Sequence, residues 1–182
     1  MREFDHLVIA ARTLEEGAAW VEARLGVPMA VGGKHEVMGT HNRLLSLGPG
    51  RFLEVISIDP EAPPPARARW FELDTPEMKR RVAKEPALVH WVERTDDLEA
   101  ELAAYPERVE ILCLQRGPYR WRMGVPRDGR FPATGKVATL IQWEGGLHPA
   151  DRLPVSGCEM VHFTPGERPS ATFRTPGGTR TI

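Results

Sequence analysis

Two segments of the chain share one order of apolar and polar positions. The first opens with an apolar run, FDHLVIAA, whose β-branched residues indicate a strand, and continues into RTLEEGAAWVEARLG. In that continuation, Leu14, Ala18, Val21 and Leu25 recur close to the helical period, so it predicts a helix. Three strand candidates separated by glycine-rich turns follow, in GVPMAVGG, THNRLLSLG and RFLEVISID. Residues 1–60 are therefore predicted to form a βαβββ module.

The same order returns after a stretch rich in proline and charge. Residues 61–86 are interpreted as a connector with a short helix near PEMKRRVA, running outside the folded modules. ALVHWVER then predicts a strand, TDDLEAELAAY a helix, and VEILCLQRG, YRWRMGVP and ATLIQWEGG three more strands. His6 precedes Leu14 by eight positions, as His90 precedes Leu98, so element order and offset both repeat. A second βαβββ module is predicted over residues 87–150.

The remaining residues, 151–182, contain short strand-like pieces broken by proline and glycine. CEMVHF and ATFRT are expected to pair as a hairpin that closes one edge of the sheet. His162, within the first of these pieces, is expected to lie on the surface. The segment is too short for a third module.

Composition and charge are those of an ordinary globular protein. The 182 residues are 41% hydrophobic and 27% charged. A net charge of −1 leaves no broad positive field to hold nucleic acid or an anionic membrane surface. The start, MREFDH, lacks the apolar core of a signal peptide, and no apolar run is long enough to span a bilayer. We therefore expect a cytoplasmic protein, with the two cysteines as free thiols.

Both predicted modules place a histidine inside the first strand, just before the helix. Alternate residues of a strand share a face, so His6 belongs to the face opposite the helix. In the last strand of the first module, Glu54 lies on one face with apolar neighbours, where a bare carboxylate is costly unless paired or bound to a cation. The matching position of the second module is taken as Gln142, with Trp143 facing the helix.

These residues, with the run GG-x-H-x-x-x-GT-x-N from Gly32 to Asn42, resemble the vicinal-oxygen-chelate superfamily, and within it the glyoxalase-like domain proteins. DHLVIA, LEEGAAWVEARLGV, RFLEVISID, RGPYRWRMGVP and LIQWEGGLHPA extend the resemblance over most of the chain. The resemblance implies an α+β fold in which two βαβββ modules form a cupped, mostly antiparallel sheet. It also implies metal ligands on the first and last strands of each module. Carried onto this chain, those ligands are His6, Glu54, His90 and Gln142.

The implied ligand set defines a coherent chemistry. Two imidazoles and a carboxylate favour a divalent transition metal such as zinc, nickel, manganese or ferrous iron. Such a metal would polarise a carbonyl or chelate two neighbouring oxygens, and Glu54 would serve as ligand and as catalytic base. Gln142 replaces the carboxylate usual in glyoxalase I. The alternative is that His6 and His90 are satisfied core histidines around a metal-free pocket.

Three further side chains are candidates for substrate binding. His41 is expected at the cup mouth, whereas Asn42 is expected to bond the backbone of a local turn. Arg120 and Arg122 share one strand face by alternation. On a concave face they would bind a carboxylate or phosphate of the substrate; on a convex face they would be solvated, which is the more common outcome.

Two classes of function follow from these patterns. The first is a metal-dependent enzyme that acts on a small oxygen-rich substrate, as a lyase, an isomerase or a ring-cleaving dioxygenase. The second is a metal-free protein that binds or sequesters a small molecule in the same cup. The fold alone does not decide between them. In both cases the partner is a small molecule, and the sequence leaves open whether the chain forms a homodimer.

Overall fold

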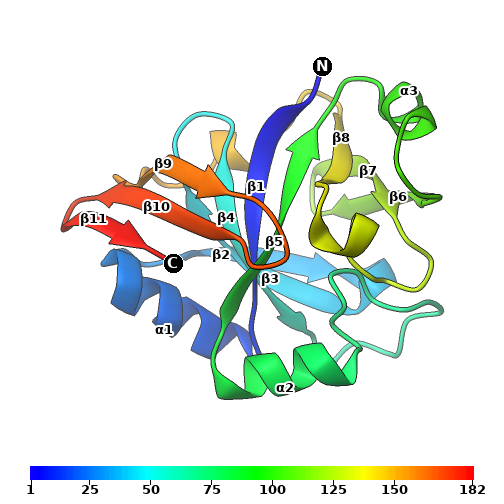
Figure 1. The fold of residues 1–182 in the computed structure, drawn as a ribbon. Helices are drawn as coiled ribbons and strands as arrows, with labels where there is room; N and C mark the ends of the chain where they lie inside the picture. Colours follow the sequence, from blue (N-terminus) through cyan, green and yellow to red (C-terminus); the bar gives the residue numbers. More distant parts are fainter.

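The computed structural model describes the whole chain, residues 1–182, as one large sheet, one small sheet and three α-helices (Figure 1). The large sheet contains β1 (Glu3–Ala10), β2 (Ala30–His35), β3 (Thr40–Ser46), β4 (Phe52–Ile58), β5 (Ala87–Arg94), β6 (Glu110–Arg116), β7 (Tyr119–Val125) and β8 (Thr139–Glu144). The helices are α1 (Leu14–Leu25), α2 (Pro76–Lys84) and α3 (Leu98–Ala103). The small sheet contains β9 (Glu159–Thr164), β10 (Ser170–Thr175) and β11 (Gly178–Thr181).

Both βαβββ modules are present in the predicted order. The first runs β1, α1, β2, β3, β4 and the second β5, α3, β6, β7, β8. The strand order across the large sheet is β2-β3-β4-β1-β5-β8-β7-β6. Only the β1–β4 and β5–β8 pairs are parallel, and the antiparallel β1–β5 pair joins the modules. The prediction of a cupped, mostly antiparallel α+β sheet is therefore confirmed.

The first helix shows why its sequence folds locally as predicted. Thr13 is the N-cap, and its side-chain oxygen accepts from the backbone N–H of Glu16 at 3.2 Å, which satisfies one of the free donors of the first turn. Gly26 ends the helix with a left-handed φ of 74°, a conformation that glycine adopts without steric cost. The buried face of α1 packs on Leu7, Ile9 and other residues from the outer side of the sheet.

The connector does not run outside the cup as expected. Its helix, α2, is present, but the residues just before it enter the concave side of the sheet. Trp70, Phe71 and Leu73 are buried there in one apolar cluster with Val8, Ile56 and other inward-facing strand residues. The sequence of this stretch is mostly polar, and three large apolar side chains are enough to anchor it. The connector therefore closes part of the cup that the two modules build.

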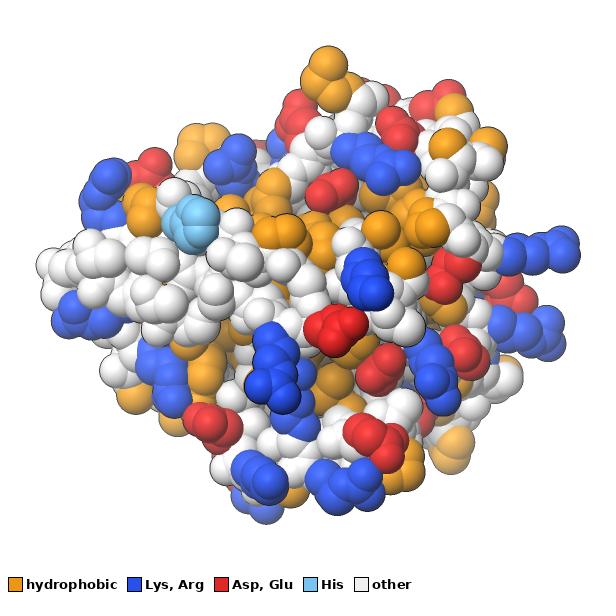
Figure 2. All heavy atoms as spheres, viewed as in Figure 1, with side chains coloured by type: hydrophobic (Ala, Val, Ile, Leu, Met, Phe, Trp, Pro, Cys, Tyr) orange, Lys and Arg blue, Asp and Glu red, His pale blue; other side chains and the backbone are white.

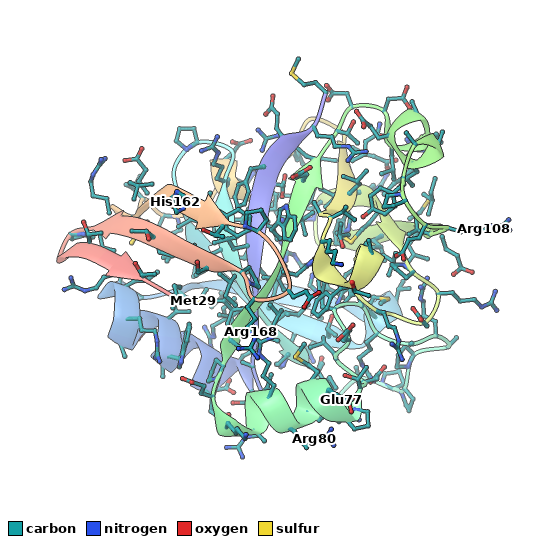
Figure 3. The ribbon with its side chains drawn as sticks, viewed as in Figure 1. Met29, Glu77, Arg80, Arg108, His162 and Arg168 are labelled. Atoms are coloured by element: carbon teal, nitrogen blue, oxygen red, sulfur yellow. The ribbon has the colours of Figure 1, made fainter.

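The C-terminal segment forms the predicted hairpin at a different place. β9 and β10 pair antiparallel, which confirms the hairpin. Together with β11 they form a separate sheet that lies beside α1, not along an edge of the large sheet (Figure 1). Phe173 of β10 is fully buried in the same cluster as Leu7 and Leu53, so this sheet covers the outer face next to the helix. Figure 3 places His162 on β9, at the exposed surface as expected.

Charged side chains of both signs are interspersed over the face shown in Figure 2. An example is the exposed pair of Glu77 and Arg80 on α2, also labelled in Figure 3. None of the helices is long and apolar enough to cross a membrane. Of the two cysteines, which form no disulfide, Cys113 is exposed and Cys158 is buried.

Candidate functional site

The concave side of the large sheet holds one small, mostly apolar pocket. Its free volume is about 20 Å³, room for one or two water molecules. Any larger ligand therefore needs part of the wall to shift. The lining comprises four polar side chains, five aromatic ones and two aliphatic ones: His6, His35, Glu54 and Arg116; Phe52, Trp70, Phe71, Trp121 and Trp143; Met123 and Ile141.

Glu54 lies at the centre of the polar group. It comes from β4, where strand alternation turns Phe52, Glu54 and Ile56 toward the cup, as the sequence predicted. Its side chain is only 7% exposed. The Asn42 amide donates to Oε1 at 2.6 Å, and the other oxygen, Oε2, lies 3.7 Å from Nε2 of His6. One carboxylate oxygen is thus held by the protein, while the other has no direct hydrogen bond.

The orientation of His6 is set by its neighbour in β1. Nδ1 of His6 lies 2.6 Å from Oδ1 of Asp5, which leaves Nε2 to face Glu54. The Asp5 carboxylate is fully buried, and Oδ2 also contacts His148 at 3.0 Å and accepts from Trp143 at 2.9 Å. Burial alone would raise the pKa of Asp5, but the hydrogen bonds from His148 and His6 lower it below its ordinary value. Asp5 is therefore an anion that fixes the imidazole ring of His6.

A second polar group approaches Glu54 from β2, β3 and β6. Nε2 of His35 lies 3.3 Å from the Asn42 amide nitrogen and 3.5 Å from Nη1 of Arg116, and Nδ1 lies 3.0 Å from Oγ1 of Thr40. Burial, followed by the nearby charge of Arg116, holds the pKa of His35 well below its ordinary value. His35 is therefore neutral. The two donors facing Nε2 assign it as the acceptor and Nδ1–H as the donor to Thr40.

The glycine pair in the GG-x-H motif makes room for this group. A Cβ on Gly32 would lie 2.0 Å from the side-chain oxygen of Asn42, and one on Gly33 would lie 2.8 Å from Cδ of Arg116. The backbone N–H of Gly33 also donates to that Asn42 oxygen at 2.9 Å. The motif thus lets Asn42 and Arg116 pack directly on β2, since any side chain there would displace them.

Of the four predicted metal ligands, only His6 and Glu54 come together in the pocket. His90 is fully buried, outside the pocket lining, and packs on the rings of Phe71 and Phe131. Its Nε2 accepts from the backbone N–H of Thr139 at 3.2 Å, and its Nδ1 has no partner. Burial lowers the pKa of His90 to about 3, so the ring is neutral at physiological pH.

Gln142 lies on the other face of the sheet. Its Oε1 accepts from the backbone N–H of Leu98, at the start of α3, at 3.0 Å. Trp143, predicted to face the helix, lines the pocket instead. The alternation of β8 is therefore opposite to the prediction.

The register of the strands preserves the predicted equivalence of the two histidines. His6 pairs with Val92 and Val8 pairs with His90 across the β1–β5 junction, as expected when a two-fold repeat relates the modules. A shift of 84 positions takes His6 to His90 and Val8 to Val92.

The same register identifies the true counterpart of Glu54. Glu54 is aligned with Val8 in the β1–β4 pair, and Thr139 is aligned with Val92 in the β5–β8 pair. Because Val8 and Val92 are equivalent, Thr139 stands where the first module has Glu54. The second module therefore supplies a hydroxyl, already hydrogen-bonded to its own histidine, in place of a carboxylate.

The donor set does not fit the implied four-ligand metal centre. The resemblance seen in the sequence implies a divalent metal held by His6, Glu54, His90 and Gln142. In this chain no group of three or more His, Cys, Asp and Glu side chains comes together in an arrangement that could hold a metal ion. The cationic Arg116, close to His35, also makes that end of the pocket unfavourable for a second cation.

The three predicted substrate-binding residues lie outside the pocket. His41 is part-exposed on β3, beside Lys34 of the neighbouring strand. Burial lowers the pKa of His41, although nearby Asp59 opposes the shift. Arg122 lies on the convex side, where it contacts Glu99 of α3 and Gln142, and Arg120 is exposed on the same strand face. Both arginines thus lie on the convex face; Arg120 is solvated there, whereas the side chain of Arg122 is only 25% exposed and is held by its polar neighbours.

Several residues that line the pocket, or hold a lining residue in place, were not predicted as site residues. Asn42 was predicted to bond the backbone of a turn. It ends the GG-x-H-x-x-x-GT-x-N motif, and this position in the motif could have indicated a site role, because the Asn42 amide binds Glu54. Arg116 ends β6 at one edge of the sheet and reaches Gly33 of β2 at the other edge, a contact that no local pattern reveals. Trp70 comes from the connector. Trp121 lies on the inward face of β7, whereas its neighbours Arg120 and Arg122 lie on the opposite face.

Comparison with known proteins places these features in a family. A family profile described as "Glyoxalase-like domain" matches residues 4–174. No curated protein shows significant similarity to the chain. A hypothetical protein from Staphylococcus aureus has a similar solved structure, with a TM-score of 0.51 and 19% identity over 79% of this chain and 59% of that protein. This likeness concerns the fold, and the chain spans less than two thirds of that protein.

Two more solved structures are similar at lower scores. Methylmalonyl-CoA epimerase from Mycobacterium tuberculosis aligns with a TM-score of 0.48 and 18% identity, over 79% of this chain and 88% of the epimerase. A hypothetical protein from Bacillus halodurans aligns with a TM-score of 0.49 and 13% identity, over 81% of this chain and 96% of that protein.

Proposed function

The chain belongs to the glyoxalase-like domain family, and we propose that it is an enzyme that moves a proton at a carbon next to a carbonyl group, as an isomerase or lyase of small oxygen-rich molecules. The observation that carries the proposal is the Glu54 carboxylate, buried in an apolar pocket with Oε1 held by Asn42 and Oε2 without a hydrogen bond. A carboxylate held in this way is a positioned general base.

The proposed step uses the residues that face the pocket. Oε2 of Glu54 takes the proton from the carbon, the C–H electron pair forms the C=C bond of an enolate, and the carbonyl π electrons move to its oxygen. Arg116, whose side chain points into the same pocket, supplies positive charge for that oxygen. The proton then returns from Glu54 to the same carbon. Where that carbon carries a hydroxyl group, it can return to the neighbouring carbon instead, since the hydroxyl proton passes to the former carbonyl oxygen and the hydroxyl carbon becomes the new carbonyl. Atoms and charge balance without a co-reactant.

The surroundings of Glu54 support its role as base. The imidazole of His6, held by Asp5 and stacked on Phe52 at 4.4 Å, keeps Nε2 beside Oε2 of Glu54. Aromatic rings line most of the remaining wall and exclude water, which strengthens the electrostatic contacts inside. His6 is thus a positioning residue for the carboxylate that carries the proton.

Deuterium exchange tests the proposal directly. Small carbonyl compounds (pyruvate, 2-oxobutanoate, hydroxyacetone and methylglyoxal) are incubated with the protein in D₂O, and loss of the α-proton signal is followed by NMR. We expect exchange of at least one compound above the buffer rate, and a loss of at least about 100-fold in Glu54→Gln. Glu15→Gln, an exposed carboxylate on α1, is the matched control and should exchange at the parent rate.

Two results would overturn the proposal. One is exchange at the same rate by Glu54→Gln and the parent, with both folded by circular dichroism. The other is the absence of exchange for every compound, in which case the cup is better interpreted as a binding or sequestration site. A small-molecule partner is common to both functions. A cytoplasmic location remains a prediction from the sequence, which leaves open whether the chain forms a homodimer.

A further inference from the structure

Two of the five tryptophans keep a buried indole N–H without an acceptor. The other three indoles donate to carboxylates: Trp20 to Glu85, Trp91 to Glu93 and Trp143 to Asp5. The unpaired donors belong to Trp70 and Trp121, which are 3% and 4% exposed, and both residues line the pocket. Buried polar groups in proteins are nearly always hydrogen-bonded, so two such exceptions in one pocket require an explanation.

Both indoles surround the end of the pocket where Arg116 lies. The ring of His35 meets Trp70 edge-on at 5.1 Å between centroids and Trp121 at 5.9 Å. Nη1 of Arg116 is 3.5 Å from Nε2 of that same histidine. Arg116 is 9% exposed and forms no ion pair within the structure, its one polar side-chain contact being with His35. Two indole rings and one guanidinium thus pack around His35.

Their chemistry defines what this end of the pocket would bind. Indole N–H and guanidinium groups only donate hydrogen bonds, and the neutral His35 already uses Nε2 as an acceptor toward Asn42 and Arg116. A guanidinium binds a carboxylate with two parallel hydrogen bonds, and both gain strength in a site closed to water. A ligand without charge would leave the guanidinium unpaired.

We propose that Arg116, Trp70 and Trp121 form a carboxylate subsite, and that the substrate is a small oxo acid. This inference rests on the proposed function, since the carboxylate at Arg116 would place the neighbouring carbonyl and its α-carbon toward Glu54. The positive charge of the guanidinium also offsets the repulsion between the substrate carboxylate and Glu54, because Arg116 and Glu54 line the same pocket. Among carbonyl compounds, the site therefore selects those that carry an adjacent acid group.

The indole N–H signals provide a direct readout. A uniformly ¹⁵N-labelled protein gives five such signals in a ¹H–¹⁵N spectrum, which five Trp→Phe variants assign. On titration with 2-oxobutanoate, we expect the Trp70 and Trp121 protons to move downfield, and those of Trp20 and Trp91 to stay in place. Methyl 2-oxobutanoate, which keeps the carbonyl and lacks the charge, should leave all of them unshifted. Sodium chloride at equal ionic strength controls for a general anion effect.

Two arginine variants complete the test. Arg116→Gln should weaken 2-oxobutanoate binding about 10- to 100-fold, the range expected for the loss of a charge-assisted contact. Arg120→Gln, on the exposed face of β7, is the matched control and should bind like the parent. Equal binding of acid and ester, parent-like affinity in Arg116→Gln, or no shift of the two indole signals would overturn the subsite.

The same measurements separate this inference from the proposed function. Glu54→Gln should still give the two indole shifts, because it leaves the three donors intact. Indole shifts without deuterium exchange in the parent would retain the subsite and refute the proton transfer. Deuterium exchange without those shifts would retain the proton transfer and refute the subsite.

Discussion

The short contact between Asn42 and Glu54 predicts how an isosteric substitution would change the pH dependence of folding. Asn42→Asp replaces the amide that donates to Oε1 of Glu54 at 2.6 Å with a second carboxyl group of the same shape. Two negative charges at that separation repel by about 6 kcal/mol at an effective dielectric constant of about 20. This repulsion corresponds to more than about four pKa units for the pair.

Structural relaxation and water reduce that figure, and we take about two units as the lower bound on the raised pKa. The folded variant would then bind a proton that the unfolded chain has lost above about pH 4.3. A group whose folded pKa is raised contributes stability that disappears as the pH rises. The free energy of unfolding of Asn42→Asp should therefore fall, relative to the parent, by about 1.4 kcal/mol per pH unit between about pH 4.5 and 6.5.

Urea denaturation at half-unit steps from pH 4 to 8 measures this slope. Asn42→Ala is the control, because it removes the amide that faces Glu54 without adding a charge. Asn42 donates to Glu54 and accepts from Gly33, so the alanine variant should be less stable by about 2–4 kcal/mol, with little dependence on pH. An aspartate variant whose stability difference from the parent stays flat across this range would show that the Asn42 amide does not face Glu54 in solution.

Three further predictions concern other parts of the site. Asp5→Asn should lower the free energy of unfolding by about 2–3 kcal/mol at pH 7. Because the pKa of Asp5 is lowered in the folded state, that difference should shrink as the pH falls below about 4. A constant difference down to pH 2 in urea titrations would contradict this prediction. Gly33→Ala should displace Arg116 and weaken 2-oxobutanoate binding about tenfold in calorimetry, while costing about 1–3 kcal/mol in stability; parent-like affinity would refute the close packing. Neither the parent nor His90→Gln, which keeps an acceptor for Thr139, should bind zinc in calorimetry, whereas zinc binding by the parent that His90→Gln weakens about tenfold or more would establish His90 as a ligand.

The alternation of inward and outward residues along each strand, together with the internal repeat, predicted those site residues whose orientation depends on one strand alone. His6 and Glu54 follow from the period of two in β1 and β4, because one face of each strand packs on the outer layer and the other lines the cup. His90 was placed correctly as the equivalent of His6. Its environment was not predictable, because Phe71 and Phe131, which cover it, come from distant loops.

The prediction that Gln142 faces the cup was wrong for a physical reason. Thr139, Leu140 and Ile141 are all buried, since both faces of β8 are covered there, so this part of the strand has no alternation from which its phase can be read. Gln142, a polar residue near the end of that run, was taken as the inward one. The register shows that Thr139 is the counterpart of Glu54, and the Gln142 side chain accepts a hydrogen bond from the first turn of α3. A one-residue error in phase moves every side chain of a strand to the other face.

Phe71, from the connector, forms part of the pocket wall. Its ring lines the pocket next to Trp70, at 5.6 Å between ring centroids, and it is buried. Phe71 and Glu72 hold left-handed φ values of 55° and 58°, which are unfavourable for residues with a Cβ, so the backbone is strained at this point of the wall. Because the pocket has only about 20 Å³ of free volume, a measured dissociation constant contains the free-energy cost of shifting part of this wall.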